Sequence, residues 1–193
     1  MALENLIQYT NKIYRAKGLA LVDKVPTPWT IHYDKKTRKV YKAFPKEKST
    51  VDFIGVFQGR SIAFDAKSTE HKTRFPLNNI KEHQIQYLKK HREHCGISFF
   101  IVEFEKHQEF YFLPIEKALE WWEGMENGRK SIPYKWFKEN CGLIRSENGV
   151  PLDYLKYCYL YIDDRQKGGR ADDDGSKDEK KGDQENRGVF ARL

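Results

Sequence analysis

Residues 49–67 read STVDFIGVFQGRSIAFDAK, and this stretch decides the fold prediction. Two runs rich in β-branched and aromatic residues flank Gln58 and Gly59, a pair typical of a two-residue type I′ turn, which needs positive φ at both positions. Counting pairs outward from that turn places Asp52 directly opposite Asp65. The sequence therefore predicts a β-hairpin that brings two carboxylates together.

The hairpin residues point to metal-dependent hydrolysis. Cross-strand partners have Cβ atoms roughly 4.5–5.5 Å apart, and like charges at that spacing need compensation. Strand alternation puts Lys67 on the same face as Asp65. Carboxylates bind Mg²⁺ or Mn²⁺, and an ammonium beside the ion can orient or deprotonate a water. An isolated Asp-x-Lys is more often a surface ion pair, but Asp52 opposite it favours a phosphodiester hydrolase.

Bulk composition supports a folded, nucleic-acid-binding chain. The 193 residues are 39% hydrophobic and carry a net charge of +7, which favours a polyanionic partner. We predict a nuclease domain over residues 1–162. Residues 163–193 form a charged tail with almost no apolar residue before its last five positions, a composition that is typical of disorder.

Cysteine usage and hydropathy exclude other classes. Cys95, Cys141 and Cys158 are odd in number and lack zinc spacing, so we expect reduced core thiols. No signal peptide opens the chain, and no apolar run approaches the roughly 18 residues of a membrane span. We therefore expect a cytoplasmic protein with no membrane partner.

A basic hairpin precedes the carboxylate hairpin. Strands are expected at residues 30–33 and 40–44, and residues 32–49 hold seven Lys or Arg against two acids, a net charge of +5. Charge runs are usually solvated faces, but this one leads directly into the proposed site, which favours DNA binding. The candidate DNA contacts there are Lys35, Lys36, Arg38, Lys39 and Lys42.

The segments around the hairpin supply further candidates. After Lys67 comes a basic loop whose Lys72 and Arg74 are placed for phosphates, and residues 128–131 offer another phosphate contact. Asn79 is the expected N-cap of a helix that ends near Gly96. On this helix Gln84 is a possible site-lining residue, although a surface amide is the simpler reading.

The first helix, predicted over residues 2–16, has Glu4 and Asn11 on one polar stripe that could border the site. A solvated helix face is the alternative. Buried strands are expected at residues 97–103 and 109–113, and helices at residues 115–123 and 134–141.

A series of motifs extends from residue 3 to about residue 162. They are Leu3-Glu4, Thr10-Asn11, Lys24-Val25-Pro26-Thr27-Pro28, Ser49-Thr50-Val51-Asp52, Gly55-Val56, Asp65-Ala66-Lys67, Lys72-Thr73, Phe75-Pro76-Leu77, His83-Gln84-Ile85, Trp121-Trp122 and Gly128-Arg129-Lys130-Ser131-Ile132-Pro133. In this order they make the chain similar to the RecU family of Holliday junction resolvases, in the PD-(D/E)xK nuclease superfamily.

The resemblance implies an α/β fold with a restriction-endonuclease-like core: a mixed central β-sheet flanked by helices, with residues 30–50 as a projecting basic stalk. It implies a homodimer that nicks two strands of a DNA four-way junction symmetrically, using Mg²⁺ or Mn²⁺. Asp52 and Asp65 would hold the metal, Lys67 would assist the attacking water, and Glu4 would complete the acidic cluster. Recombinase or branch-migration proteins are possible partners.

Two positions depart from the family pattern. Asp65 stands where Glu is usual, which shortens the carboxylate by one methylene, and Val51 replaces a common Thr beside Asp52. Two alternatives to the resolvase stay open at this point. One is another PD-(D/E)xK endonuclease, and the other is a non-catalytic junction-binding or recombinase-regulating protein.

Overall fold

The computed structural model describes residues 3–26, 29–34, 36–45, 50–126 and 128–159. At its centre is a six-stranded mixed sheet in the order β1-β4-β5-β7-β8-β10, in which only β5 and β7 are parallel. Its strands are β1 (Leu21–Lys24), β4 (Phe53–Phe57), β5 (Arg60–Thr69), β7 (Ile97–Phe104), β8 (Glu109–Pro114) and β10 (Gly142–Ile144). The predicted mixed α/β architecture is confirmed.

The β4–β5 hairpin has the predicted turn and register. Gln58 and Gly59 have φ of 49° and 72°, as a type I′ turn requires. The ladder begins with Phe57 opposite Arg60 and continues without a slip to Phe53 opposite Phe64. The turn chemistry therefore fixed the register of the whole hairpin.

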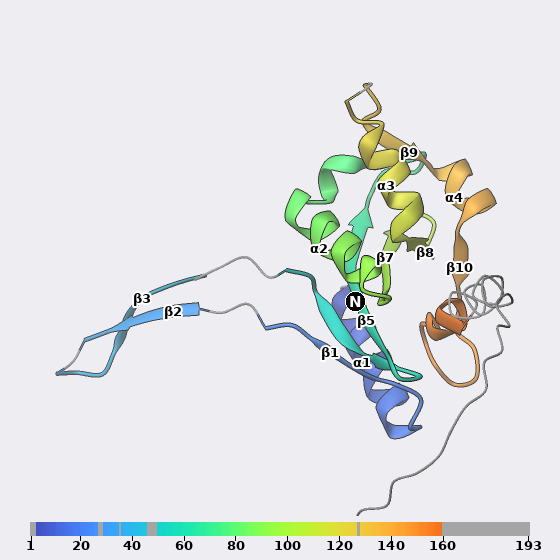
Figure 1. Ribbon diagram of the computed structural model, residues 1–193. Coiled ribbons are helices and arrows are strands. Elements are labelled where there is room, and N and C mark those ends of the chain that lie inside the picture. Colours follow the sequence, from blue (N-terminus) through green and yellow to red (C-terminus); the bar gives the residue numbers. More distant parts are fainter. Residues whose placement is uncertain (1–2, 27–28, 35, 46–49, 127, 160–193) are drawn as a thin grey trace, which may run out of the picture.

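Helices cover both faces of the sheet (Figure 1). Helix α1 (Leu3–Ala16) packs on one face in a core that contains Phe64. Helices α2 (Glu82–Glu93), α3 (Ile115–Glu123) and α4 (Tyr134–Asn140) belong to the other face, whose core contains Ala63. Because side chains alternate along β5, Asp65 points to the Ala63 face and Ala66 to the α1 face.

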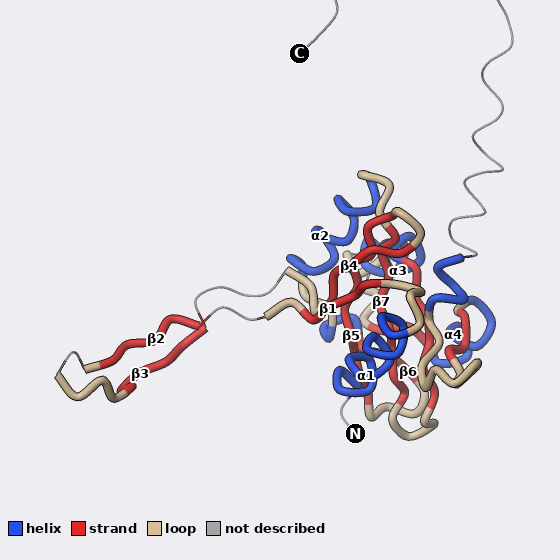
Figure 2. The backbone as a smooth tube through the Cα atoms, turned by 90° about the horizontal axis from the view of Figure 1, so that it is seen from below, coloured by secondary structure: helices blue, strands red, loops and turns tan. Residues whose placement is uncertain are grey.

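The basic segment forms a separate two-stranded hairpin of β2 (Trp29–Tyr33) and β3 (Val40–Pro45). It projects away from the sheet in both Figure 1 and Figure 2. Asp34 shapes its tip, because Oδ1 accepts hydrogen bonds from the backbone N–H groups of Lys36 and Thr37. The bond from Thr37 is the main cause that lowers the pKa of Asp34. This is the projecting hairpin that the sequence predicted.

A short strap links the site strand β5 to helix α2. It contains β6 (Arg74–Pro76), which pairs with β9 (Ser131–Pro133), and the 3-10 helix η1 (Leu77–Asn79). The expected N-cap at Asn79 is wrong, because α2 begins at Glu82 with Lys81 as its N-cap. The Asn79 amide instead donates to the Ser68 carbonyl at 3.3 Å, which ties the strap back to β5.

Within the described ranges, no helix is both long enough and apolar enough to cross a bilayer. The charged tail predicted at residues 163–193 lies outside the described residues.

Candidate active site

Asp65 is the buried centre of the candidate site. Its side chain is 0% exposed, and Lys67, which is 14% exposed, places its ammonium 2.5 Å from Oδ1. The other oxygen, Oδ2, accepts a hydrogen bond of 2.6 Å from the Gln84 amide. In the part of the chain that the structure describes, Oδ1 has no hydrogen-bond partner of good geometry beside that ion pair. The Gln84 amide thus holds one carboxylate oxygen, and the Lys67 ammonium contacts the other.

Asp52 is held next to Asp65 by the backbone. It stands one residue before Phe53, which forms the last pair of the ladder with Phe64, so the predicted register continued by one step sets Asp52 opposite Asp65. Its Oδ2 accepts a hydrogen bond of 3.0 Å from the N–H of Ala66, the residue after Asp65. This backbone bond orients the Asp52 carboxylate toward β5.

The environment shifts the protonation of Asp65. Its pKa is raised to about 7: burial is the largest cause, the Lys67 ammonium opposes it, and the neighbouring Asp52 carboxylate adds to the rise. A carboxyl with this pKa is only partly ionised near neutral pH. A cation at the site would favour the ionised form, so proton release and cation binding are coupled here.

Gln84 is locked in a single orientation. Its Oε1 accepts a hydrogen bond of 3.1 Å from the N–H of Lys81 at the start of α2. This acceptor role assigns the oxygen, and the nitrogen is then the atom that donates to Asp65. The first turn of α2 therefore positions the carboxylate, so the structure gives Gln84 a buried site contact in place of a surface amide.

The donor set fits a hard divalent cation. Asp52 and Asp65 supply carboxylate oxygens, and Mg²⁺ typically uses one or two carboxylates with waters and substrate phosphates. Over the described ranges there is no cluster of three or more His, Cys, Asp or Glu side chains that could hold a metal. Any ion at this site would therefore need ligands from water or substrate, as Mg²⁺ in phosphoryl chemistry does.

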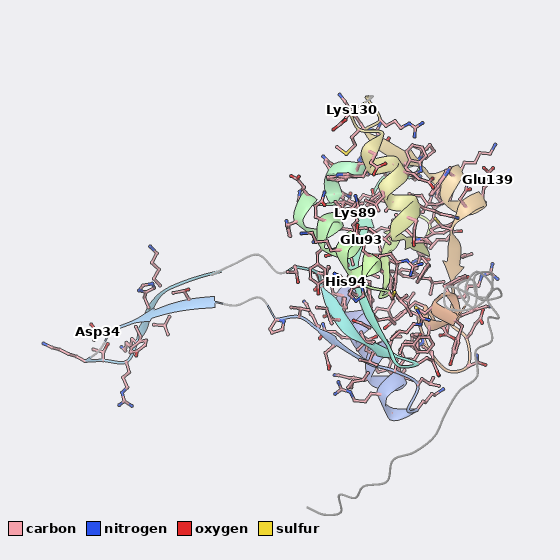
Figure 3. All side chains as sticks on the ribbon, in the orientation of Figure 1. Asp34, Lys89, Glu93, His94, Lys130 and Glu139 are labelled. Atoms are coloured by element: carbon pink, nitrogen blue, oxygen red, sulfur yellow. The ribbon has the colours of Figure 1, made fainter. Side chains whose placement is uncertain are left out.

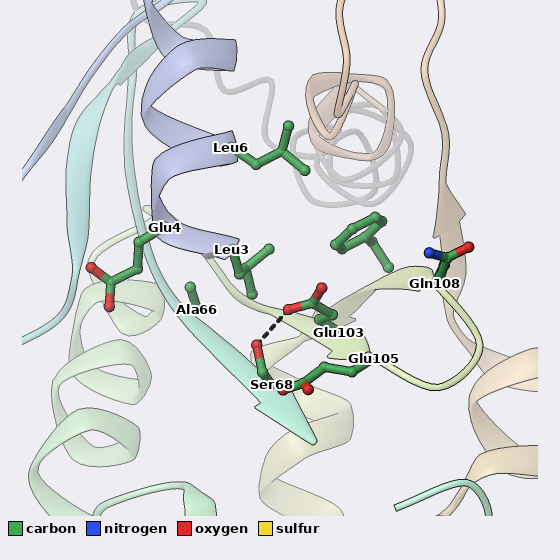
Figure 4. A pocket seen from close by; sticks show the side chains of 9 residues that line it. Leu3, Glu4, Leu6, Ala66, Ser68, Glu103, Glu105 and Gln108 are labelled. Carbon is green, nitrogen blue, oxygen red and sulfur yellow. Dashed lines mark hydrogen bonds between the residues drawn. The ribbon is translucent and has the colours of Figure 1, made fainter. Parts of the chain in front are cut away.

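Glu4 and Asn11 have other partners. Glu4 forms an ion pair with Lys24 on β1 and is half-exposed. Figure 4 shows its carboxylate pointing away from Glu103 and Ser68, which also line the pocket of about 800 Å³ under α1. Asn11 is 5% exposed and accepts a hydrogen bond of 2.6 Å from the Tyr154 hydroxyl. The prediction that Glu4 and Asn11 share a polar stripe of the first helix is therefore wrong for Asn11, which lies in the interior.

The candidate DNA contacts are exposed. Lys36, Arg38, Lys39 and Lys42 lie on the projecting hairpin, whose tip is marked by Asp34 in Figure 3, while Lys35 is outside the described residues. Lys72 and Arg74 are exposed on the strap after β5. The sequence reasoning missed the backbone donors at Ala66 and Lys81, because an amide N–H leaves no signal in residue identity.

A family model and the sequences of curated proteins indicate the same family. The model of the family described as "RecU: Recombination protein U" matches residues 1–159. Proteins named Holliday junction resolvase RecU are similar to this chain: that of Oceanobacillus iheyensis is 39% identical over 160 residues, covering 80% of this chain and 82% of that protein. The Geobacillus sp. (strain WCH70) protein is 42% identical and covers 80% of each chain.

The protein of that name from Bacillus subtilis is 38% identical over 160 residues, covering 80% of this chain and 77% of its own length. Among solved structures, that of Archaeoglobus fulgidus Hjc, a Holliday junction resolvase, has a TM-score of 0.39 at 9% identity and covers 69% of this chain and 92% of that chain.

Proposed function

Because this chain belongs to the Recombination protein U (RecU) family, we propose that it is a structure-selective endonuclease that resolves four-way DNA junctions during recombination and repair. The observation that carries the proposal is the pair of carboxylates on the β4–β5 hairpin, with Lys67 paired to the buried one. Relatives named Holliday junction resolvase support the choice of substrate. We place the reaction in the cytoplasm.

We assign the metal to Asp52 and Asp65, with Mg²⁺ or Mn²⁺ as the ion. When bound, such an ion neutralises charge on the phosphate and lowers the pKa of water. Asp65 can serve as a ligand only when ionised, and among the described residues the Lys67 ammonium is the group that contacts its Oδ1. Its Oδ2 is kept in place by Gln84 while Oδ1 changes partners.

Lys67 has two roles in the proposal. Before the cation binds, its ammonium balances the charge of Asp65 at 2.5 Å. With a cation bound at Asp65, the Lys67 ammonium would donate hydrogen bonds to the attacking water and to the scissile phosphate and so orient them; an ammonium has no lone pair with which to take the proton of that water. The ion pair with Asp65 thus holds the Lys67 ammonium next to the proposed metal site before the metal binds.

Glu4 is proposed as a more distant acidic residue of the site. Its present partner is Lys24, on the strand next to β4. Joining the acidic cluster requires Glu4 to exchange this partner, so we rank its contribution below those of Asp52 and Asp65.

The DNA contacts are assigned to the projecting hairpin and the strap. Exposed Lys36, Arg38 and Lys39 lie at or beside the hairpin tip, where an extended arm can reach into an open junction. We propose that the enzyme acts as a homodimer, since symmetric nicking of two strands needs two sites. Recombinase or branch-migration proteins are proposed as further partners.

Cleavage of an end-labelled immobile four-way junction, beside linear duplexes of the same sequence, tests this function. We expect paired nicks at symmetric positions in the junction with Mg²⁺ or Mn²⁺, and no nicks with EDTA. Equal cleavage of junction and duplex would instead identify another type of endonuclease. Tight junction binding without any metal-dependent nick would leave a non-catalytic junction-binding protein.

A further inference from the structure

A second concave surface lies beyond the active site, between the strap and the segment before β9. It is a groove of about 600 Å³ lined by His71, Arg74, Pro76, Asn78, Asn79, Met125, Lys130 and Ser131. Among these lining residues none is acidic, and the polar ones are two cations (Arg74 and Lys130), an imidazole, two amides and a hydroxyl. Figure 3 shows Lys130 at the end of the body, well apart from Asp34 at the hairpin tip.

The groove has fixed walls. Strands β6 and β9 pair from Arg74 opposite Pro133 to Pro76 opposite Ser131. The N–H of Leu77 donates to the Lys130 carbonyl at 3.0 Å, which closes the floor between the two walls. Arg74 and Ser131 are therefore set on adjacent strands with little freedom of the backbone.

The cationic side chains near the groove differ in whether another side chain of the protein contacts them. The Arg129 guanidinium lies 5.2 Å from the centre of the Trp121 ring, so it is engaged by the protein itself. Arg74 and Lys130 are exposed and face the groove. They present positive charge to whatever occupies it.

Hydrogen bonds tie the groove to the two elements that carry the candidate site. The Lys81 ammonium donates to the Asn78 carbonyl, and the Lys81 N–H donates to Gln84, which holds Asp65. Independently, Asn79 donates to the carbonyl of Ser68, the residue after Lys67. The lining of the groove is thus bonded to the start of α2 and to the end of β5, the two elements that carry Gln84, Asp65 and Lys67.

We propose that the groove binds the sugar–phosphate backbone of the cleaved strand on one side of the scissile phosphate. The inference rests on the proposed nuclease function and adds the path of the strand. Arg74 and Lys130 contact phosphate oxygens, and the Asn78, Asn79 and Ser131 side chains supply hydrogen bonds that carry no sequence information. The hairpin and the groove then hold the DNA from two directions around one site.

Binding measurements without metal test the groove independently of cleavage. Junction affinity is measured in EDTA over a range of salt for the wild type, Arg74→Gln, Lys130→Gln and the double variant. Each removed charge should weaken binding several-fold and lower the slope of log affinity against log salt by about one. Lys135→Gln is the control, because Lys135 is an exposed cation on α4 outside the groove.

Neutral phosphates locate the contact. Single methylphosphonates are placed at successive positions on both sides of the nick site that the wild type makes. For the wild type we expect a several-fold loss of affinity when the neutral phosphate lies on one side of the nick site only. For Arg74→Gln we expect no further loss at those same positions. For the control Lys135→Gln, the effects of the substitution and of the neutral phosphate should add.

Unchanged salt slopes in both groove variants, or additive losses at every position, would overturn the inference. A wild type that binds junctions but never nicks them would overturn the proposed function instead. The two failures are therefore distinguishable.

Discussion

Acidic side chains lie in contrasting surroundings at the two faces of β5. On one face Asp65 is fully buried, paired with Lys67 and held by Gln84. On the other, Ser68 and Ala66 line the open pocket with Glu103 and Glu105, and the Ser68 hydroxyl donates to Glu103 at 2.6 Å. The second face therefore presents two glutamates to a pocket of about 800 Å³.

Burial decides the difference between these faces. The pKa of Asp65 is raised to about 7, mainly because it is removed from water, so its charge depends on a nearby cation. The Glu103 carboxylate is only partly buried and has a neutral hydroxyl as its partner. The proposed site is therefore distinguished by desolvation and a fixed partner, and not by pocket size or by the number of acids.

Neutralising one acid on each face of β5 should give the largest difference in cleavage rate. Asp65→Asn should lower junction cleavage by on the order of 10³-fold or more, since several kcal/mol of charge stabilisation are lost with the metal. Glu103→Gln should cleave like the wild type. Gel assays under single-turnover conditions measure both. A fully active Asp65→Asn variant would remove Asp65 from the chemistry.

Removing the partner of each acid should give the next largest effect. Gln84→Leu removes the hydrogen bond to Asp65 and the one from the Lys81 N–H. Loss of a side chain that orients a metal ligand typically lowers metal affinity or activity by roughly 10–100-fold. Ser68→Ala removes only the hydroxyl that contacts Glu103. The cleavage rate against Mg²⁺ concentration separates them. Equal rates in the two variants would contradict a positioning role for Gln84.

The pH dependence of the free energy of unfolding tests the burial of Asp65. Because the folded pKa of Asp65 is about 7 and its ordinary value is 3.8, the native state holds the proton while the unfolded state has lost it. The free energy of unfolding of the metal-free protein should therefore fall as pH rises from about 4 to 7, by on the order of a few kcal/mol.

Denaturant unfolding at a series of pH values measures this loss. Asp65→Asn should lose less stability over the window, and Mg²⁺ should stabilise the wild type most at the alkaline end, where Asp65 is ionised. Wild type and variant curves that run parallel from pH 4 to 7 would show that Asp65 is not the titrating group.

The smallest expected effect concerns the acidic pocket and DNA. Glu105 is exposed, so Glu105→Gln should tighten junction binding by less than about twofold, and this difference should vanish at high salt. Fluorescence anisotropy at two salt concentrations is the measurement. A large loss of affinity on this substitution would mean that the pocket takes part in binding.

The hairpin could be predicted because it is local. A two-residue turn with positive φ at Gln58 and Gly59 permits one register, and that register brings Asp52 beside Asp65 without knowledge of the rest of the chain. The helices around it followed from apolar periodicity in the same way, to within a few residues at their ends.

What failed to follow from the sequence depends on distant partners. Asn11 looked like a polar-face residue, but Tyr154, 143 positions later, holds it in the interior. Glu4 had no visible reason to pair with Lys24, since the strand order that brings them together arises only in the folded sheet. The start of α2 was misplaced because Lys81 cannot cap with its side chain and Gln84 supplies the bond instead.

Direct titration of Mn²⁺ into the DNA-free protein, followed by electron paramagnetic resonance, tests the central claim that Asp52 and Asp65 form the metal site. The account predicts saturable binding to the wild type and to Glu103→Gln, and loss of that binding in Asp52→Asn and in Asp65→Asn. Binding to Asp65→Asn as tight as to the wild type would contradict it.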